Sequence, residues 1–344
     1  MTIVEDKRAI TGGVDTHADV HVAAALDPIG GLLGVQEFPA TAAGYAGLPG
    51  WLAGSGTVAL AGVEGTGSYG AGLARHMAAA GVPVVEAARP AGSPPQGQSD
   101  PLDAVSAARA AQSGRAAGAP KGRDGAVEAI RPLMVAERTA RNERTQANGQ
   151  ARSLIVTGPD DLRARFARHT VAALAAELAA LRPRRGDVPG YATRIALREL
   201  GRRAQFPGAQ LERPGELIVP LAGARAPRLP ALHGIGPDTA ALLLIAAGDH
   251  PERLRSEPAW AHMGAVAPIP ASSGKVRRHR LNPGGNREAS HALWRIVITR
   301  MSSHPATRAY GDRRTEEGLS KKEIIRCLKR YAAREVCHHL RAGG

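Results

Sequence analysis

Residues 9–26 read AITGGVDTHADVHVAAAL, and this stretch decides the fold. Two apolar runs, Ala9–Val14 and Val20–Leu26, flank a short polar segment, as in two strands joined by a tight turn. The turn DPIG follows at residues 27–30, and Leu33–Phe38 continues as a third strand. The chain therefore predicts three consecutive antiparallel strands at the start of its first domain.

Helices and strands alternate after these three strands. Helical patterns cover residues 43–53, 69–80 and 101–112, and buried strands cover residues 57–63 and 82–86. The resulting order, βββαβαβα, is the one used by ribonuclease-H-like folds. The first and fourth strands are neighbours in such sheets, so we expect the ends of these two strands to meet near one edge.

Four carboxylates fall at the ends of these predicted elements. Asp15 ends the first strand in GVDTH, and Glu64 ends the fourth in VEGTGSYG. Asp100 and Asp103 open the last helix in QSDPLDA. Unit charges about 4 Å apart interact at roughly 4 kcal/mol in an effective dielectric near 20, so four clustered carboxylates need a cation to stay ionised. Mg²⁺, or Mn²⁺ in its place, suits such oxygen ligands, and the group predicts metal-assisted phosphoryl transfer.

Each of these acids also has a purely structural interpretation. The string DPLD at residues 100–103 has the form of a helix cap, with Asp at the N-cap, Pro at the first helical position and an acid two residues later. Asp15, with His17 and Asp19 nearby, fits a turn, and Glu64 beside a glycine fits a loop. The joint occurrence of all four favours the metal site.

Charge is divided unevenly along the 344 residues, a length that suits two or three domains. Residues 1–120 contain 6 Lys and Arg against 10 Asp and Glu, whereas the remaining residues contain 39 against 21. The acidic part fits a catalytic domain and the basic part fits polyanion binding, although arginine-rich solvated helices also produce such a charge.

The middle of the chain is predicted to be helical. A linker rich in Gly, Ala and Pro covers residues 111–125, and helical periodicity follows over residues 126–156, 160–182 and 190–205. Within it, arginines spaced three apart lie along one helix face, where they could contact phosphates, pair with another subunit, or simply be solvated. These are Arg138, Arg141 and Arg144.

Residues 232–249, LHGIGPDTAALLLIAAGD, resemble a helix-hairpin-helix unit. Gly234 and Gly236 bracket a turn whose backbone N–H groups could hold a phosphate, and Pro237 then starts a helix. The alternative is a tight turn between two packed helices.

A second constellation, IPASSGKVRRHRLNPGGNR, covers residues 269–287. Ser272 and Ser273 precede a glycine and a cluster of cations, so a serine hydroxyl there could attack a phosphodiester. The residues alone favour a basic hairpin that binds the DNA backbone, with the serines as turn residues. The candidate nucleic-acid-binding cations are Lys275, Arg277, Arg278, Arg280 and Arg287.

The rest of the sequence bears on the surroundings of the protein. Cys327 and Cys337 are too far apart along one predicted helix to bond to each other, which indicates a reduced, cytosolic protein. We find no signal-peptide pattern and no run of 18 uncharged apolar residues. Ser320 and Glu323 predict a capping box for the last helix, and a metal site at residues 337–339 is disfavoured because contiguous residues point different ways.

Taken together, these strings resemble the IS-110-type insertion-sequence transposases, a family of DEDD recombinases guided by a bridge RNA. The resemblance rests on GVDTH, VEGTGSYG and SDPLDA, and then on LHGIGPDTA, GAVAPIPASSGKVRRHRLNPGGNR and GLSKKEIIRCLKRYAAREV. These stretches span nearly the whole chain in the order of the family.

The resemblance implies roles for particular residues. Asp15, Glu64, Asp100 and Asp103 would form the metal-binding quartet, and Ser273 would be the nucleophile that becomes linked to DNA, with Ser272 as the alternative. The serine and the quartet would come from different subunits of a homo-oligomer, a dimer or a tetramer. Partners would be donor and target DNA and a structured guide RNA, in a bacterial cytoplasm and on the nucleoid when bound.

The resemblance also implies a division of the chain. Residues 1–117 would form a RuvC-like DEDD domain, residues 118–225 a helical or coiled-coil linker for oligomerisation, and residues 226–344 a mainly helical domain with the serine and the helix-hairpin-helix. One departure is Gln98, where a lysine is common in the family. The alternatives are a hydrolytic RuvC-like nuclease of the junction-resolving kind and an inactive copy that only binds nucleic acid.

Overall fold

The computed structural model describes residues 8–87, 99–116, 118–183, 186–205, 207–249, 254–275, 279–280, 282 and 284–341. Their contacts separate two compact units, Met1–Arg123 and Asp124–Gly344. The boundary between a first and a later part of the chain lies close to the predicted linker. The further division of the second unit at residue 225 stays a prediction.

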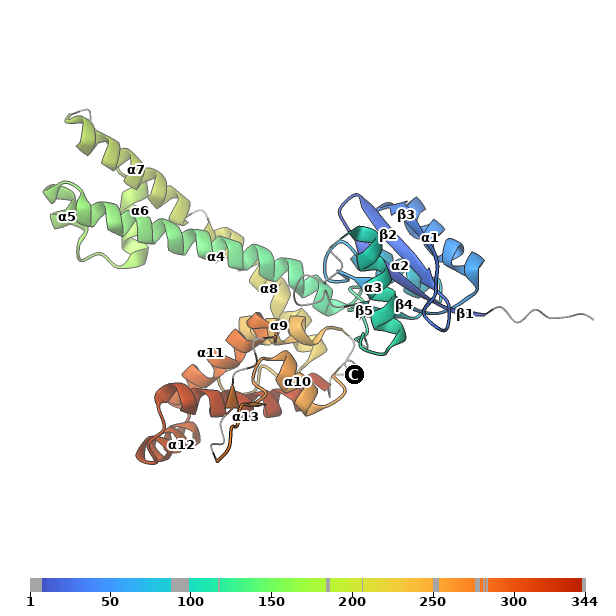
Figure 1. The fold of residues 1–344 in the computed structure, drawn as a ribbon. Coiled ribbons are helices and arrows are strands. Elements are labelled where there is room, and N and C mark those ends of the chain that lie inside the picture. The colour runs from blue at the N-terminus through green and yellow to red at the C-terminus, as the bar shows by residue number, and fades with distance from the viewer. Residues whose placement is uncertain are drawn as a thin grey trace, which may run out of the picture. The chain divides into compact units, whose positions relative to one another are not determined.

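A five-stranded mixed sheet forms the centre of the first unit (Figure 1). The strand order is β3-β2-β1-β4-β5, in which β1 pairs antiparallel with β2 and parallel with β4. This is the mixed sheet expected of a ribonuclease-H-like domain, and the predicted adjacency of the first and fourth strands is confirmed. The strands are β1 (Ala9–Thr16), β2 (Val20–Leu26), β3 (Leu32–Pro39), β4 (Thr57–Glu64) and β5 (Val84–Ala87).

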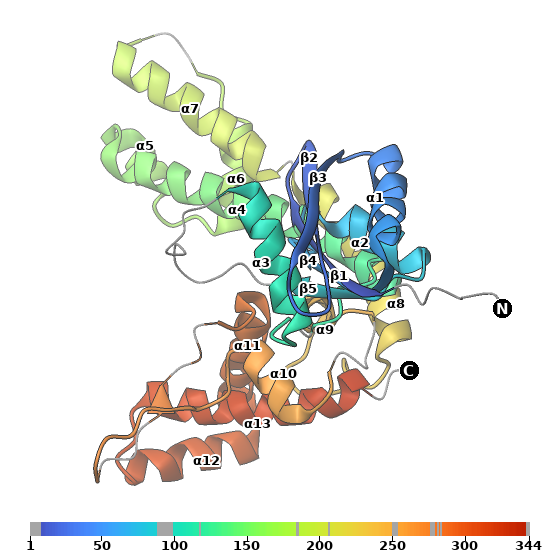
Figure 2. The ribbon, with the colours of Figure 1, turned by 45° about the vertical axis from the view of Figure 1, so that its right-hand side comes forward.

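Helices cover both faces of this sheet (Figure 2). On one face α1 (Ala42–Ser55) and α2 (Ala71–Ala79) bury residues such as Leu52 and Met77 against the sheet. On the other face α3 (Asp100–Gln112) packs its alanines against β2. The alternation of side chains along each strand supplies an apolar residue to both layers, which explains why nearly every residue of β1 and β2 is buried.

Two glycines let α3 lie directly on the sheet. A Cβ atom at Gly13 of β1 would be 2.2 Å from the backbone oxygen of Ala104, and one at Gly62 of β4 would be 2.4 Å from that of Ala107. The helix backbone therefore occupies the space that side chains would otherwise take. This close approach sets the position of the first turn of α3, which carries two of the four predicted acids.

The second unit is mainly helical, as predicted. Its helices are α4 (Ala126–Thr157), α5 (Asp160–Phe166), α6 (Val171–Ala179), α7 (Val188–Gln205), α8 (Pro207–Arg225), α9 (Pro237–Ala247), α10 (Glu257–Met263), α11 (Arg287–Ser303), α12 (Pro305–Glu316) and α13 (Lys321–Arg341). A two-stranded hairpin of β6 (Ile269–Pro270) and β7 (His279–Arg280) interrupts them. The free thiols Cys327 and Cys337 lie on α13.

Two cores support this unit. A small core joins α5, α6 and α7 to the end of the long helix α4 (Figure 1). The larger core joins the beginning of α4 to α8, α9, α11 and α13 around the buried Trp260. None of the helices in the described part of the chain has the length and apolar character that crossing a bilayer requires.

Two details of the helical region differ from the sequence prediction. The predicted helix over residues 160–182 is two helices, because Thr170 begins a new one by accepting a hydrogen bond from the backbone N–H of Ala173. Helix α8 contains Pro214 and Pro220, residues that ordinarily end a helix, and it was not predicted as a separate element.

Candidate active site

Asp15 lies at the centre of the candidate site in the first unit. It is the penultimate residue of β1, and it faces α3 because Gly13, two residues earlier, contacts that helix. Its side chain is fully buried, and neither carboxylate oxygen has a hydrogen-bond partner among the described residues. Burying an ionised carboxylate without hydrogen-bond partners lowers the stability of the fold, so a positive charge beside Asp15 would be stabilising.

The first turn of α3 brings a second acid to Asp15. One carboxylate oxygen each of Asp15 and Asp100 and one ring nitrogen of His17 lie within 4.8 Å of one another. Asp103, half-buried, lies one helical turn further along. The helix-cap interpretation is wrong, because Ser99 is the N-cap residue and its side chain makes no capping hydrogen bond in the described structure.

Glu64 ends β4 beside β1, and its side chain is buried. The hydroxyl of Thr16 donates a hydrogen bond of 2.8 Å to the Glu64 backbone oxygen, which ties the ends of the two strands together. Gly65 then takes a left-handed conformation with φ of 64°, which turns the chain away into the loop before α2.

The charge of Asp15 is disfavoured by its surroundings. Burial raises the pKa of Asp15 above its ordinary value, and the nearby carboxylates of Glu64, Asp103 and Asp100 raise it further, whereas His17 lowers it. Glu64, Asp100 and Asp103 therefore all lie close enough to Asp15 to disfavour its charge. The four acids come together at the ends of β1 and β4 and at the first turn of α3, as the order of these elements along the chain predicts.

His17 is the residue that the sequence interpretation underestimated. The sequence interpretation names it only as a neighbour of Asp15 in a possible turn, but its Nδ1 atom lies 3.6 Å from Oδ2 of Asp15. His17 follows Asp15 by two positions, and residues at that spacing in an extended chain point to the same side. The string Asp-x-His at the end of a buried strand was therefore the signal for a ligand pair.

A divalent cation fits this group of side chains. Asp15 and Asp100 offer carboxylate oxygens, which suit both Mg²⁺ and Mn²⁺, and His17 offers an imidazole nitrogen, which Mg²⁺ accepts less readily than Mn²⁺ does. The unpartnered oxygens of Asp15 supply the charge that such an ion requires. Glu64 and Asp103 lie near enough to influence Asp15 electrostatically, but they are not among the side chains whose ligand atoms lie within 4.8 Å of one another.

The predicted serines lie in the second unit, in the hairpin between β6 and β7. Ser272 and Ser273 are exposed, and Gly274 follows with φ of 57°. Lys275 and Arg280 are exposed in the same hairpin, and Arg287 is exposed at the start of α11. Arg277 and Arg278 lie outside the described residues. The hydroxyls are thus accessible to a large substrate.

The predicted helix-hairpin-helix turn is packed on α11. Gly234 has φ of 81°, and a Cβ atom there would lie 3.2 Å from the backbone oxygen of Ile296. The guanidinium of Arg300 donates a hydrogen bond of 2.7 Å to the backbone oxygen of His233. Gly236, by contrast, has open space around it as the N-cap of α9. One side of the turn is therefore structural and the other is accessible.

The arginines along α4 have partners within the unit. Arg138 pairs with Glu288 of α11, and Arg141 pairs with Asp238 of α9 at 2.8 Å and with Glu137. These ion pairs attach α4 to the C-terminal helices. Arg138 and Arg141 thus have carboxylate partners within the unit although their side chains are still 48% and 41% exposed, and a further contact of theirs with phosphate or with another subunit stays a prediction.

Comparisons with known proteins match both units. The family model described as "Transposase IS116/IS110/IS902 family" matches residues 226–312, and a second model, of DEDD type and described as "Transposase", matches residues 12–157. The chain is also 31% identical over 122 residues to the "Insertion element IS110 uncharacterized 43.6 kDa protein" of Streptomyces coelicolor. That match covers 34% of this chain and 29% of the relative.

Proposed function

Because the chain belongs to the IS116/IS110/IS902 family of transposases, we propose that it cuts and rejoins the DNA of an insertion sequence by phosphoryl transfer. Ser273 is the proposed nucleophile, and the acids around Asp15 form the proposed metal site. The observation that carries the proposal is the fully buried carboxylate of Asp15, which has no hydrogen-bond partner in the described part of the chain and has a histidine and a second carboxylate within 4.8 Å.

The proposed ligands are Asp15, His17 and Asp100, supported by Glu64 and Asp103. A bound Mg²⁺ or Mn²⁺ would neutralise these charges and the negative charge that develops on a phosphate during transfer. Asp15 and Glu64 are fixed by the sheet, whereas Asp100 is exposed at the helix start. The fixed pair holds its geometry, and the exposed acid lies on the side open to a substrate.

The proposed chemistry conserves the number of phosphodiester bonds. The Ser273 hydroxyl gives up its proton, its oxygen bonds to phosphorus, and the bond from phosphorus to the leaving deoxyribose oxygen breaks as that oxygen takes up a proton. A hydroxyl of a second DNA end then attacks the phosphoserine and releases the serine. Lys275 and Arg280 of the hairpin, with Arg277, Arg278 and Arg287, would offset the phosphate charge during both steps.

Assembly and guidance are further parts of the proposal. The serine and the acids belong to different units of the chain, and we infer that they meet between subunits of a homo-oligomer. A structured guide RNA would select donor and target DNA by base pairing. The accessible Gly236 side of the turn before α9 would contact a phosphate backbone.

A covalent trapping experiment tests the nucleophile. The wild-type protein, incubated with element-end DNA, guide RNA and Mn²⁺, should give a protein–DNA adduct on a denaturing gel. Ser273→Ala should remove the adduct, and Ser272→Ala, the matched neighbour, should retain it. Free DNA ends without an adduct would instead identify a hydrolytic nuclease, and DNA binding with no cleavage in any condition would identify an inactive copy.

A further inference from the structure

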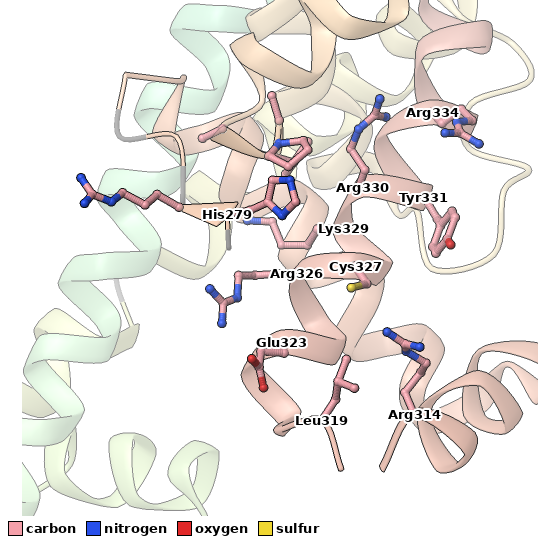
Figure 3. Close-up of a pocket in the computed structure, with 15 residues that line it drawn as sticks. His279, Arg314, Leu319, Glu323, Arg326, Cys327, Lys329, Arg330, Tyr331 and Arg334 are labelled. Atoms are coloured by element: carbon pink, nitrogen blue, oxygen red, sulfur yellow. The ribbon is translucent and has the colours of Figure 1, made fainter. Parts of the chain in front are cut away.

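A cavity of about 1030 Å³ opens beside the serine hairpin in the second unit. Its walls are residues 265–268 and β7 on one side, and α13 with the end of α12 on the other (Figure 3). This cavity is not apparent from the sequence, and among its residues only Arg280 is a predicted nucleic-acid-binding cation. Its position within one unit means that its geometry does not depend on the first unit.

The lining of this cavity is strongly cationic. Six cationic side chains but only one carboxylate, that of Glu323, line it. The cations are Arg280, Arg314, Arg326, Lys329, Arg330 and Arg334. The Glu323 carboxylate already accepts hydrogen bonds of 2.9 and 2.6 Å from the N–H and hydroxyl of Ser320, in the predicted capping box. The lining of the cavity therefore carries an excess of positive charge that Glu323 alone does not balance.

The cations divide into paired and unpaired groups. Arg314 pairs with Glu317, and Arg330 pairs with Glu257. For the remaining four, no ion pair occurs within the described part of the chain. These four are Arg280, Arg326, Lys329 and Arg334. Such unpaired cations in a concave surface raise the local concentration of anions.

Lys329 is the least solvated of the four. Its Nζ atom donates a hydrogen bond of 2.7 Å to the hydroxyl of Ser290 on α11, and burial lowers its pKa below the ordinary value. A half-buried ammonium without a carboxylate partner is stabilised when an anion enters the cavity. Its hydrogen bond to Ser290 also fixes the position of the charge.

The cations extend along α13 rather than clustering at one point. Arg326 and Arg334, with the paired Arg330 between them, follow one another at intervals of four residues and span about 12 Å at 1.5 Å per residue. A small anion such as phosphate would occupy only part of that length. Tyr331, half exposed on the same wall and in edge contact with Tyr310, adds a flat apolar surface. Phosphates in series with an unpaired base fit this combination.

We propose that this cavity binds the sugar–phosphate backbone of a nucleic-acid strand that continues to the serine hairpin. Ser273 follows Pro270 of β6 by three residues, which an extended chain spans in at most roughly 11 Å. A strand held against α13 would thus approach the Ser273 hydroxyl along β6 and β7. The identification of the anion as nucleic acid rests on the proposed transposase function.

Fluorescence anisotropy of labelled oligonucleotides tests the cavity without divalent metal. The probes are a single-stranded DNA, a duplex DNA and an RNA hairpin of equal length. Neutralising both helix-end cations by Arg326→Gln and Arg334→Gln should weaken binding of at least one probe about fivefold or more at 0.1 M salt. It should also lower the slope of log K against log salt by about 1.4 to 1.8.

A matched control changes net charge equally at another exposed site. Arg163→Gln with Arg168→Gln, on and just after α5, should weaken binding less than twofold. Arg326→Lys with Arg334→Lys keeps the charge and should retain most of the binding, which separates lost charge from disturbed folding. The probe most affected by the cavity variant identifies the strand that the cavity holds.

Three results would overturn the proposal: no binding of any probe by the wild-type protein, equal losses in the cavity and control variants, or no loss in the cavity variant. None of these depends on cleavage. A protein that binds through the cavity but forms no adduct would contradict the proposed chemistry alone.

Discussion

At the scale of single residues, the ionised carboxylate of Asp15 is destabilising unless a cation lies beside it. Its two buried oxygens have no hydrogen-bond partner among the described residues, and three other carboxylates lie close to it. Leaving a buried polar group unsatisfied costs roughly 1–3 kcal/mol, and more for a charged one. The clustered acids are therefore expected to lower the stability of the metal-free protein and to favour binding of a divalent ion.

Replacing Asp15 by Asn should make the metal-free protein more stable. The substitution removes the buried charge, and a gain of about 1 kcal/mol corresponds to a rise of roughly 2–8 °C in the unfolding midpoint, depending on domain size. Thermal unfolding with and without Mn²⁺ checks this, because the variant should lose the metal-dependent increase of the wild type. Asp19→Asn, in the exposed turn, is the control and should change neither value.

The pH dependence of the metal-free protein follows from the same group. Because the pKa of Asp15 is raised in the folded state, the folded protein binds a proton more tightly than the unfolded chain does. The contribution of Asp15 to stability is present below its unfolded pKa and is lost as the pH rises through the raised value. Urea titrations in chelator should show a smaller loss over this interval in Asp15→Asn; identical profiles for both proteins would contradict it.

His17 should affect the choice of metal. An imidazole nitrogen suits Mn²⁺ better than Mg²⁺, which prefers oxygen ligands. We expect His17→Ala to weaken Mn²⁺ binding on the order of tenfold, equivalent to about 1.4 kcal/mol, and Mg²⁺ binding less. Isothermal titration calorimetry of both ions checks this, with His76→Ala on α2 as the control. Equal losses for the two ions would assign His17 a structural role only.

At the scale of secondary-structure elements, the contact of α3 with β1 and β4 assembles the site. The first turn of α3 reaches Asp15 only because Gly13 and Gly62 let the helix backbone approach the sheet. This contact acts on the metal site although neither glycine is a ligand.

Gly13→Ala should therefore impair both folding and metal binding. The added methyl would lie 2.2 and 2.3 Å from backbone atoms of Ala104 and Ala108, so α3 must shift. Overpacking of this kind costs typically about 1–3 kcal/mol. Chemical unfolding and Mn²⁺ titration measure the two effects. Gly50→Ala, in α1 with nothing within 4 Å, should be neutral or stabilising by about 0.5–1 kcal/mol. A tolerated Gly13→Ala would show that α3 is not held by this contact.

The sequence predicts much of the first unit but less of the helical second unit. Apolar runs and the DPIG turn predicted the sheet, and strand order predicted that the strand ends carrying Asp15 and Glu64 lie side by side. The helix break at Thr170 was missed because apolar periodicity does not reveal a local N-cap. Helix α8 was missed because its two prolines ordinarily end a helix, and tertiary packing overrides that propensity. The ion pairs of Arg138 and Arg141 involve residues far apart in the chain, which periodicity does not reveal.

At the scale of the whole molecule, charge and chemistry are distributed between two units. The first unit carries the acids, and the second carries the serines and most of the positive charge. Metal affinity is therefore expected to depend on the first unit, whereas the salt dependence of nucleic-acid binding is expected to depend on the second. How a serine meets the acids is a question of assembly.

Mixing two inactive variants tests whether the serine and the acids act across subunits. Asp15→Asn keeps the serine, and Ser273→Ala keeps the acids, so a mixed dimer contains one complete site only if each site is shared between subunits. We expect adduct formation in co-expressed mixtures and none with either variant alone. Absence of adduct from mixed oligomers of verified composition would place both groups of a site in the same subunit.

The most direct test of the central claim is anomalous diffraction from crystals of the protein grown with Mn²⁺. The account predicts a manganese peak bonded to carboxylate oxygens of Asp15 and Asp100 and to a ring nitrogen of His17, lost in crystals of Asp15→Asn. Well-ordered crystals with no peak at this position, or with manganese bound only elsewhere, would contradict it.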